Sequence, residues 1–365
     1  MAKHVKTESD LLAQLLATLQ RLPDVTARLR PLEGSSPVAS QPADAELEVN
    51  VSGTAVTVVV ELKKAAFPRE ARQLLGKLSE RGASIGRATR RGATVHMLAA
   101  ESIAPGAKQL LRDEGIGYFD AGGSLYLPAR GAYLLVEKPA PKSQARVVRS
   151  LFKGSRAQVL QVLLSRPRQW INGRSLAEQA MVSAATASET LAALERFDWV
   201  IARGKGPAKE RCLTEPGGLL DAWAAKVAEE PPLPASRYFV SAANSDQLID
   251  QLARACEASH AEYAVTAEAA AQRYAPWLSS ISQVKCRLVA GGARMAALAA
   301  MDARGVEEGA NLVVFEVKTP GQLLLRERFK GAWFASPVQV YLDLLRGEGR
   351  AKEAAAHLRK ERIGF

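Results

Sequence analysis

Cysteine and histidine are scarce in this chain. Its 365 residues include three cysteines and four histidines. The number of cysteines is odd, and Cys212, Cys256 and Cys286 are not separated by the short spacings typical of zinc ligands. No histidine is paired with them. We therefore expect no structural metal, no disulfide framework and no bound cofactor.

Long apolar runs and catalytic motifs are also lacking. No stretch approaches eighteen consecutive apolar residues, and the segment from Met1 to Lys6 leads into an amphipathic region, not into a signal-peptide core. We expect a cytoplasmic protein without a membrane partner. No internal repeat, phosphate-binding glycine loop or nucleophile–base motif is apparent, so the sequence does not by itself predict an enzyme.

Positive charge, in contrast, is in excess. The formal net charge is +11, with a pI near 9.6, 47% hydrophobic and 24% charged residues. This composition is typical of a soluble globular protein, and the length suits two or three domains. Between Lys142 and Arg211 there are 13 basic residues and 5 acidic ones. Such a local surplus indicates a polyanionic partner, and we expect double-stranded DNA.

The segment from Lys153 to Arg211 has the pattern of a winged helix-turn-helix, the central part of a domain at residues 145–228. A helix with a broad apolar face begins near Ser155, and a second and a third helix follow. The third places Leu191, Leu194 and Phe197 at three-residue spacing behind a small polar start. Strands at 199–203 and 210–213 would flank a basic tip at 204–209.

Such a module reads DNA with the exposed N-terminal turns of its third helix, which enter a major groove about 12 Å wide. The hairpin tip would lie on the phosphates. Base contacts are expected from Ser183, Thr186, Ala187 and Ser188. Phosphate contacts are expected from Arg156, Arg174, Arg203, Lys205, Lys209 and Arg211. The alternative interpretation is a protein-interaction adaptor, because some winged helices have that role.

Residues 1–140 suggest a separate α/β domain with a mixed sheet. We expect a helix over 8–30 that Pro23 ends or kinks. Strands at 46–51 and 54–63, a helix at 69–81, a strand at 94–100, a helix at 105–114 and strands at 124–127 and 132–137 should follow. This order, with Glu61-Leu62-Lys63 closing a central strand, resembles the core of the PD-(D/E)xK nuclease superfamily.

That resemblance implies a magnesium site formed by an upstream acid, Glu61 and Lys63. Period-two geometry places Glu61 and Lys63 on one face of the strand. Asp44, Glu46 and Glu48 are all candidates for the upstream acid, and the nuclease alternative uses Glu48. We expect a catalytically silent nuclease-like domain, so no catalytic residue or metal is assigned. Phe315-Glu316-Val317-Lys318 repeats the same pattern elsewhere.

A linker at residues 139–144 and a proline-rich boundary at 229–234 leave a third, α/β region at 235–365. The runs from Tyr263 to Ala270 and from Ala335 to Leu344 resemble the C-terminal region of the AbiEi-type antitoxins of type IV toxin–antitoxin systems. The resemblance covers roughly residues 150–365, and the domain ahead of it departs from the simplest members. It implies a transcriptional autorepressor that binds inverted repeats and opposes a nucleotidyltransferase-like toxin; the extra domain leaves a stand-alone regulator of mobile elements as the alternative. We expect a homodimer on the DNA. The expected fold is therefore a three-domain α/β protein with a central winged helix.

Overall fold

The computed structural model of the chain describes residues 8–30, 44–80, 93–129, 132–138, 150–277, 280–347 and 349–365. It is a mixed α/β protein, which confirms the fold class at that level. The chain divides into two compact units, one of residues 1–148 and 195–198, the other of residues 149–194 and 199–365. The expected linker at 139–144 lies outside the described residues.

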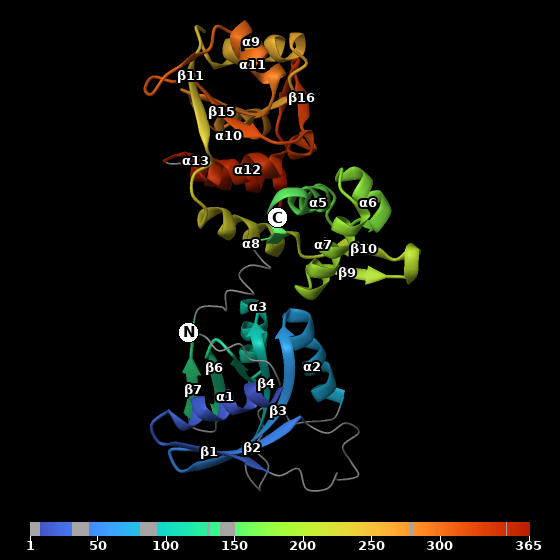
Figure 1. The fold of residues 1–365 in the computed structure, drawn as a ribbon, viewed down its shortest axis with the longest axis vertical. Helices are drawn as coiled ribbons and strands as arrows, with labels where there is room; N and C mark the ends of the chain where they lie inside the picture. Colours follow the sequence, from blue (N-terminus) through green and yellow to red (C-terminus); the bar gives the residue numbers. More distant parts are fainter. Residues whose placement is uncertain are drawn as a thin grey trace. The chain divides into compact units, whose positions relative to one another are not determined.

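The first unit is built on a seven-stranded sheet in the order β1-β2-β3-β4-β5-β6-β7 (Figure 1). Strands β3, β4 and β5 are parallel, and the remaining pairs are antiparallel. Its elements are α1 (Glu8–Gln20), β1 (Val25–Arg30), β2 (Ala45–Val51), β3 (Thr54–Ala66), α2 (Pro68–Glu80), β4 (Ala93–Ile103), α3 (Pro105–Asp113), β5 (Gly117–Asp120), β6 (Leu125–Ala129) and β7 (Ala132–Val136).

Both faces of this sheet are covered by helices. Leu11, Leu15 and Leu19 of α1 are buried in one core cluster, together with the side chains of β3 that alternate from Val56 to Leu62. Helices α2 and α3 form a second cluster with side chains of the opposite face. The alternation of buried residues along β3 therefore follows directly from the two-residue period of a strand between two helical layers.

The helix expected over residues 8–30 is wrong in its second half. The helix ends at Gln20, and β1 begins at Val25 and pairs with β2. Val25 and Ala27 point into the core while Thr26 and Arg28 are exposed, which is the alternation of an edge strand. Residues 117–120, expected as a connection, form β5 between β4 and β6.

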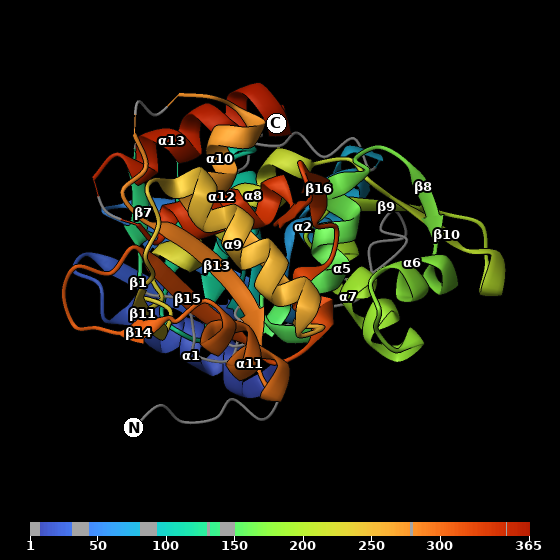
Figure 2. The same cartoon turned by 90° about the horizontal axis from the view of Figure 1, so that it is seen from above.

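The second unit begins with three helices and a small antiparallel sheet in the order β8-β10-β9. The hairpin of β9 and β10 projects beyond the helices in both views (Figures 1 and 2). The elements are α5 (Gly154–Ser165), β8 (Trp170–Asn172), α6 (Gly173–Gln179), α7 (Ala184–Arg196), β9 (Val200–Arg203), the 3-10 turn η1 (Gly206–Ala208), β10 (Glu210–Leu213) and α8 (Pro216–Ala228).

The rest of the second unit is a seven-stranded mixed sheet in the order β14-β11-β15-β13-β12-β17-β16. Helices α9 and α11 lie on one face, and α10, α12 and α13 lie on the other (Figure 1). The elements are β11 (Ala235–Phe239), α9 (Ser245–Ala258), β12 (Tyr263–Thr266), α10 (Ala267–Tyr274), β13 (Val284–Val289), α11 (Gly292–Ala300), β14 (Arg304–Gly305), β15 (Leu312–Val317), η2 (Pro320–Leu323), β16 (Glu327–Phe329), β17 (Ala332–Phe334), α12 (Pro337–Leu345), α13 (Ala351–Leu358) and the terminal turn η3 (Arg359–Ile363).

Three of these strands, β14, β16 and β17, are short and were not expected from the sequence. The boundary expected at 229–234 does not divide compact units, since residues on both sides of it belong to the second unit. Among the described residues, no helix has the length and apolar character needed to span a bilayer.

Candidate nucleic-acid interface

The N-terminus of α7 is fixed by a local hydrogen bond. The Oγ of Ser183 accepts a hydrogen bond from the backbone N–H of Thr186 at 3.1 Å, and the two hydroxyl oxygens lie 2.9 Å apart. Serine is a preferred residue at the start of a helix because its oxygen binds an N–H that the helix leaves unpaired. Ser183 therefore acts structurally at the position where a base contact was expected.

The two faces of α7 differ sharply in exposure. One face of α7 is fully buried and carries residues three or four positions apart, Ala187, Thr190, Leu191 and Leu194. Ser188 is exposed on the other face, as are Ala184 and Ala185 in the first turn, while Thr186 is half-buried. The expected contact by Ala187 is therefore incompatible with its position. The small exposed side chains at the start of α7 let the backbone approach a ligand closely, and the exposed Glu189 beside them pairs with Arg156.

The hairpin of β9 and β10 has a tight tip. Gly204 and Gly206 have φ values of 75° and 59°, in the left-handed region that glycine adopts without steric cost. Between them Lys205 is exposed. Lys209 and Arg211 on the returning side are half-buried, and an Arg211 guanidinium nitrogen donates to the Lys209 carbonyl at 3.4 Å. The tip therefore presents Lys205 most openly.

Several of the expected phosphate-binding cations are already paired. Arg203 donates through Nε to Glu210 at 2.8 Å, and its guanidinium carbon lies 4.2 Å from the centre of the Trp170 ring. Trp170 on β8 and Glu210 on β10 thus hold Arg203 along the hairpin. An arginine held in this way loses less conformational entropy when it binds phosphate.

Arg156 and Arg174 also have acidic neighbours. Arg156 on α5 donates to the Ser150 hydroxyl and to Glu189 on α7, each at 2.9 Å. Arg174 pairs with Glu178 one turn further along α6 at 3.1 Å, and its side chain is 88% exposed. An exposed pair of this kind contributes little to stability, so Arg174 can exchange its partner for a phosphate at small cost.

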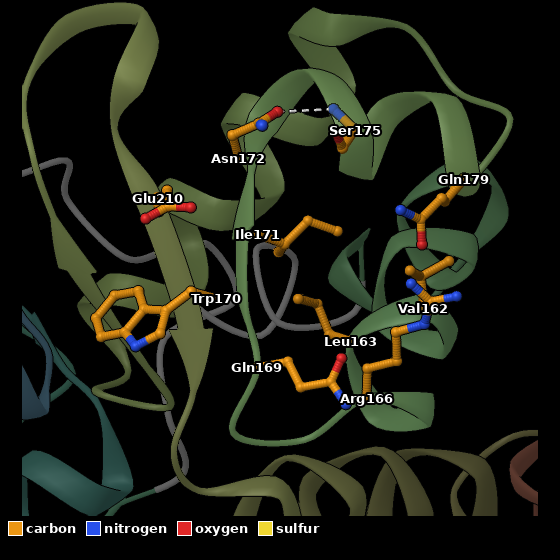
Figure 3. A pocket seen from close by; sticks show the side chains of 10 residues that line it. All are labelled: Val162, Leu163, Arg166, Gln169, Trp170, Ile171, Asn172, Ser175, Gln179 and Glu210. Atoms are coloured by element: carbon orange, nitrogen blue, oxygen red, sulfur yellow. Dashed lines mark hydrogen bonds between the residues drawn. The ribbon is translucent and has the colours of Figure 1, made fainter.

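A shallow recess lies between α5, β8, α6 and β10 (Figure 3). Its volume is 210 Å³, below the roughly 300–1,000 Å³ typical of pockets for small molecules. The Asn172 side chain accepts a hydrogen bond from the Ser175 backbone at 2.8 Å and so caps α6 (Figure 3). The recess is a feature of packing around this cap, and it does not suit a small-molecule ligand.

Helix α5 is buried on nearly all sides, which the sequence did not indicate. Residues 158–164 are all buried, including Gln158 and Gln161. The Gln161 amide donates to the Gln339 oxygen of α12 at 2.8 Å, and its oxygen accepts from the Ser336 hydroxyl at 3.2 Å. The first helix of the candidate interface is thereby joined to the C-terminal sheet region.

This junction continues as a buried polar network. Asp343 on α12 accepts hydrogen bonds from Gln339 at 2.9 Å and from Arg287 Nε at 2.8 Å, and it also binds Thr266. The Asp343 side chain is 1% exposed and that of Arg287 is 11% exposed. The Ser336-Pro337-x-Gln339 start of α12 thus has a polar role, in addition to the buried apolar face formed by Val338, Tyr341 and Leu342.

The other candidate site lies at the end of β3. Lys63 and Glu61 form an ion pair of 2.9 Å, which confirms that the two share a face of the strand. Asp44 accepts a hydrogen bond from the Leu62 backbone N–H at 2.7 Å. Glu48 is wrong as the upstream acid, because it lies opposite Thr57 in the register and pairs with Arg28.

The charges at this site support one another. The hydrogen bond with Glu61 raises the pKa of Lys63; burial opposes that shift, and the charges of Glu61, Asp44 and Glu8 add to it. Burial raises the pKa of Glu61. The hydrogen bonds and charges of Lys63 and Lys77 together lower that pKa by more than burial raises it, so it lies below its usual value. Both side chains therefore stay charged at neutral pH.

Comparisons of the chain with protein-family models, characterised proteins and solved structures found no match. Function therefore has to be inferred from the chain's own surfaces. In the part of the chain that the structure describes, no three His, Cys, Asp or Glu side chains are grouped so as to hold a metal ion. The two surfaces with a chemical rationale are the region of α7 with the β9–β10 hairpin, and the group formed by Asp44, Glu61 and Lys63.

Proposed function

We propose that residues 150–213 form a winged helix-turn-helix that binds double-stranded DNA, and that the protein is a transcriptional regulator. In this proposal α7 is the recognition helix, and the β9–β10 hairpin is the wing. Base contacts come from Thr186 and Ser188, with Ser183 holding the helix start. Phosphate contacts come from Arg156, Arg174, Arg203, Lys205, Lys209 and Arg211.

One observation carries the proposal: α7 buries one face completely and exposes the small side chains of Ala184, Ala185 and Ser188, beside Glu189, which Arg156 holds. Ala184, Ala185 and Ser188 would allow the helix to enter a major groove without steric hindrance, and alanine methyl groups can contact the methyl group of thymine. The capped N-terminus also directs the positive end of the helix dipole outward, which favours phosphate. The projecting basic hairpin adds a second contact at the backbone.

The kind of regulation is proposed from the resemblance to AbiEi-type antitoxins. Those proteins repress their own operon, so we propose an autorepressor that binds inverted repeats as a homodimer. A reporter gene placed under the upstream region of this protein's own gene tests the idea. Repression should be relieved by Ser188→Arg, which places a bulky side chain on the exposed face of α7. Equal reporter output with and without the protein would exclude autorepression.

DNA binding itself is tested by sequencing the DNA recovered with the purified protein and measuring affinity for the selected sequence. The slope of the logarithm of affinity against that of salt concentration changes by about 0.9 for each phosphate contact. Lys205→Ala should weaken binding to all sequences and reduce the slope by about that amount. Lys318→Ala, an exposed lysine distant in sequence from the hairpin, is the matched control. Identical isotherms for both variants and the parent would remove the wing from the proposal, and recovery of no DNA would favour a protein adaptor.

A second candidate function, cleavage of DNA, is favoured by the position of Asp44 beside the Glu61–Lys63 pair. Magnesium is commonly held by one or two carboxylates, waters and substrate phosphates, so Asp44 and Glu61 would suffice as protein ligands. The ion would supply activated water and stabilise charge on the phosphate. Lys63, with its raised pKa, would attract the phosphate. Glu61 also contacts Lys77, which competes for the same carboxylate.

Incubation of purified protein with plasmid and linear duplex in magnesium or manganese tests this candidate. Cleavage that is lost in Asp44→Asn and Lys63→Ala, with folding retained, would assign nuclease activity to this group. Lys64→Ala, on the next and exposed position of the same strand, is the control and should cleave as the parent does. Intact DNA with the parent protein would leave the domain as a non-catalytic scaffold, which is the outcome we expect.

A further inference from the structure

A cavity of 330 Å³ lies in the second unit, where α5 and α8 meet α12 and β13. This volume falls within the range of pockets that bind small molecules, at its lower end. It suits a compact metabolite and is too small for a dinucleotide. The cavity touches the first helix of the proposed DNA-binding element and Arg287 of the C-terminal sheet.

The side chain of Gln158 gives the cavity a polar group. Gln158 is 8% exposed and lines the cavity, and its amide carries both hydrogen-bond donors and an acceptor. Gly321 of η2 makes room for it, since a Cβ at that position would lie 1.7 Å from the Gln158 nitrogen.

The walls of the cavity suggest the charge of its ligand. Lys153, Arg287 and Arg346 line it; Glu230 binds Lys153 and Arg346, and Asp343 binds Arg287, so three cations face two carboxylates. Arg287 uses Nε and one terminal nitrogen on Asp343, and a guanidinium carries five N–H donors, so it keeps others for a ligand. An anion therefore fits the charge.

The aromatic wall suggests a flat ligand. Phe152 and Trp223 stack with ring centres 5.8 Å apart and an angle of 21° between their planes, and both rings line the cavity. Aromatic rings bind other planar rings by offset stacking or edge contact. The amide of Gln158 offers both donors and an acceptor to the edge of such a ring.

We propose that this cavity binds a small planar anion of the size and chemistry of a nucleoside monophosphate. The ring would lie against the Phe152–Trp223 wall with its polar edge on Gln158, and the phosphate would lie toward Lys153 and Arg287. Ligand binding is independent of the proposed function; only an influence of the ligand on DNA affinity would depend on it.

Titration calorimetry of the full chain with AMP, GMP, CMP and UMP, up to about 1 mM, tests the site, with inorganic phosphate as a fifth probe. We expect saturable binding of at least one nucleotide with a stoichiometry of one. Gln158→Met, which keeps the volume and removes the amide, should weaken that affinity at least tenfold. Ala157→Met, which fills the cavity from a neighbouring position of α5, should do the same.

Gln251→Met on α9 is the matched control and should bind as the parent does, and circular dichroism melts verify that each variant is folded. If no nucleotide binds, or if both cavity variants bind as tightly as the parent, the proposal is overturned. If inorganic phosphate binds as tightly as the best nucleotide, the ring contributes no affinity, and the proposal of a planar ligand is overturned. No DNA is present in these titrations, so their failure is distinguishable from failure of the DNA-binding proposal.

Discussion

The ion pair of Arg287 and Asp343 should be a principal determinant of stability in the second unit. Asp343 is buried and serves Arg287, Gln339 and Thr266 at once. Removing one partner of a buried pair leaves an uncompensated charge and costs about 3–5 kcal/mol. We expect Asp343→Leu and Arg287→Met each to lower the free energy of unfolding by that amount. The double variant should be destabilised by clearly less than the sum, because neither charge is left alone.

Equilibrium urea unfolding followed by tryptophan fluorescence is well suited to this measurement. All five tryptophans lie in the second unit, so the signal reports on that unit alone. Asp246→Ala is the control, because Asp246 pairs with Arg273 but its side chain is 71% exposed, and such pairs contribute up to about 1 kcal/mol. If Asp343→Leu destabilises the unit no more than Asp246→Ala does, the network does not hold α12 against the sheet, and the reasoning is wrong.

Three further outcomes are expected. Ser188→Ala should change the free energy of unfolding by no more than about 0.5 kcal/mol and alter base discrimination by about 1–3 kcal/mol in competition binding. Leu191→Ala should instead lower the free energy of unfolding by about 2–5 kcal/mol in thermal melts. The reverse result would mean that α7 is rotated about its axis relative to this structure. The lowered pKa of Glu61 contributes stability that is complete above the ordinary pKa of 4.5 and is lost as pH falls through the pKa of the folded protein. The melting temperature of Glu61→Gln should therefore fall less in acid than that of the parent. Parallel curves of melting temperature against pH would contradict this. Burial raises the pKa of Cys256 to about 12, so a thiol reagent at pH 8 should label it only after denaturation, and rapid labelling of native protein would show that the site opens.

Local patterns in the sequence predicted individual elements of the fold well. The alternation along β3 and the leucine spacing of α1 each depend on a single period and on neighbours in the chain. β1 was missed because Pro23 was interpreted as ending or kinking one long helix, although Val25, Ala27 and Leu29 already alternate at the spacing of a strand. The pairing with β2 that makes it a strand involves residues about twenty positions away.

The candidate sites were harder to predict because they depend on the register of strand pairing and on the rotation of each helix about its axis. Glu48 and Asp44 are equally acidic in the sequence, and only the pairing of β2 with β3 shows which one lies next to Glu61. Similarly, the small residues of α7 do not reveal that Ala187 faces inward. Gln161 was unremarkable in sequence because its partners, Ser336 and Gln339, follow about 175 positions later.

The bond between Gln161 and α12 has a consequence for how this protein could change over evolutionary time. Many domains can be exchanged between proteins as independent pieces, because few contacts cross their boundaries. Here an exchange of α5 alone would leave the amide of Gln339 and the hydroxyl of Ser336 facing a foreign helix inside a buried interface. Recombination should therefore transfer residues 150–365 as a block, and a change at Gln161 should be inherited together with a compensating change on α12.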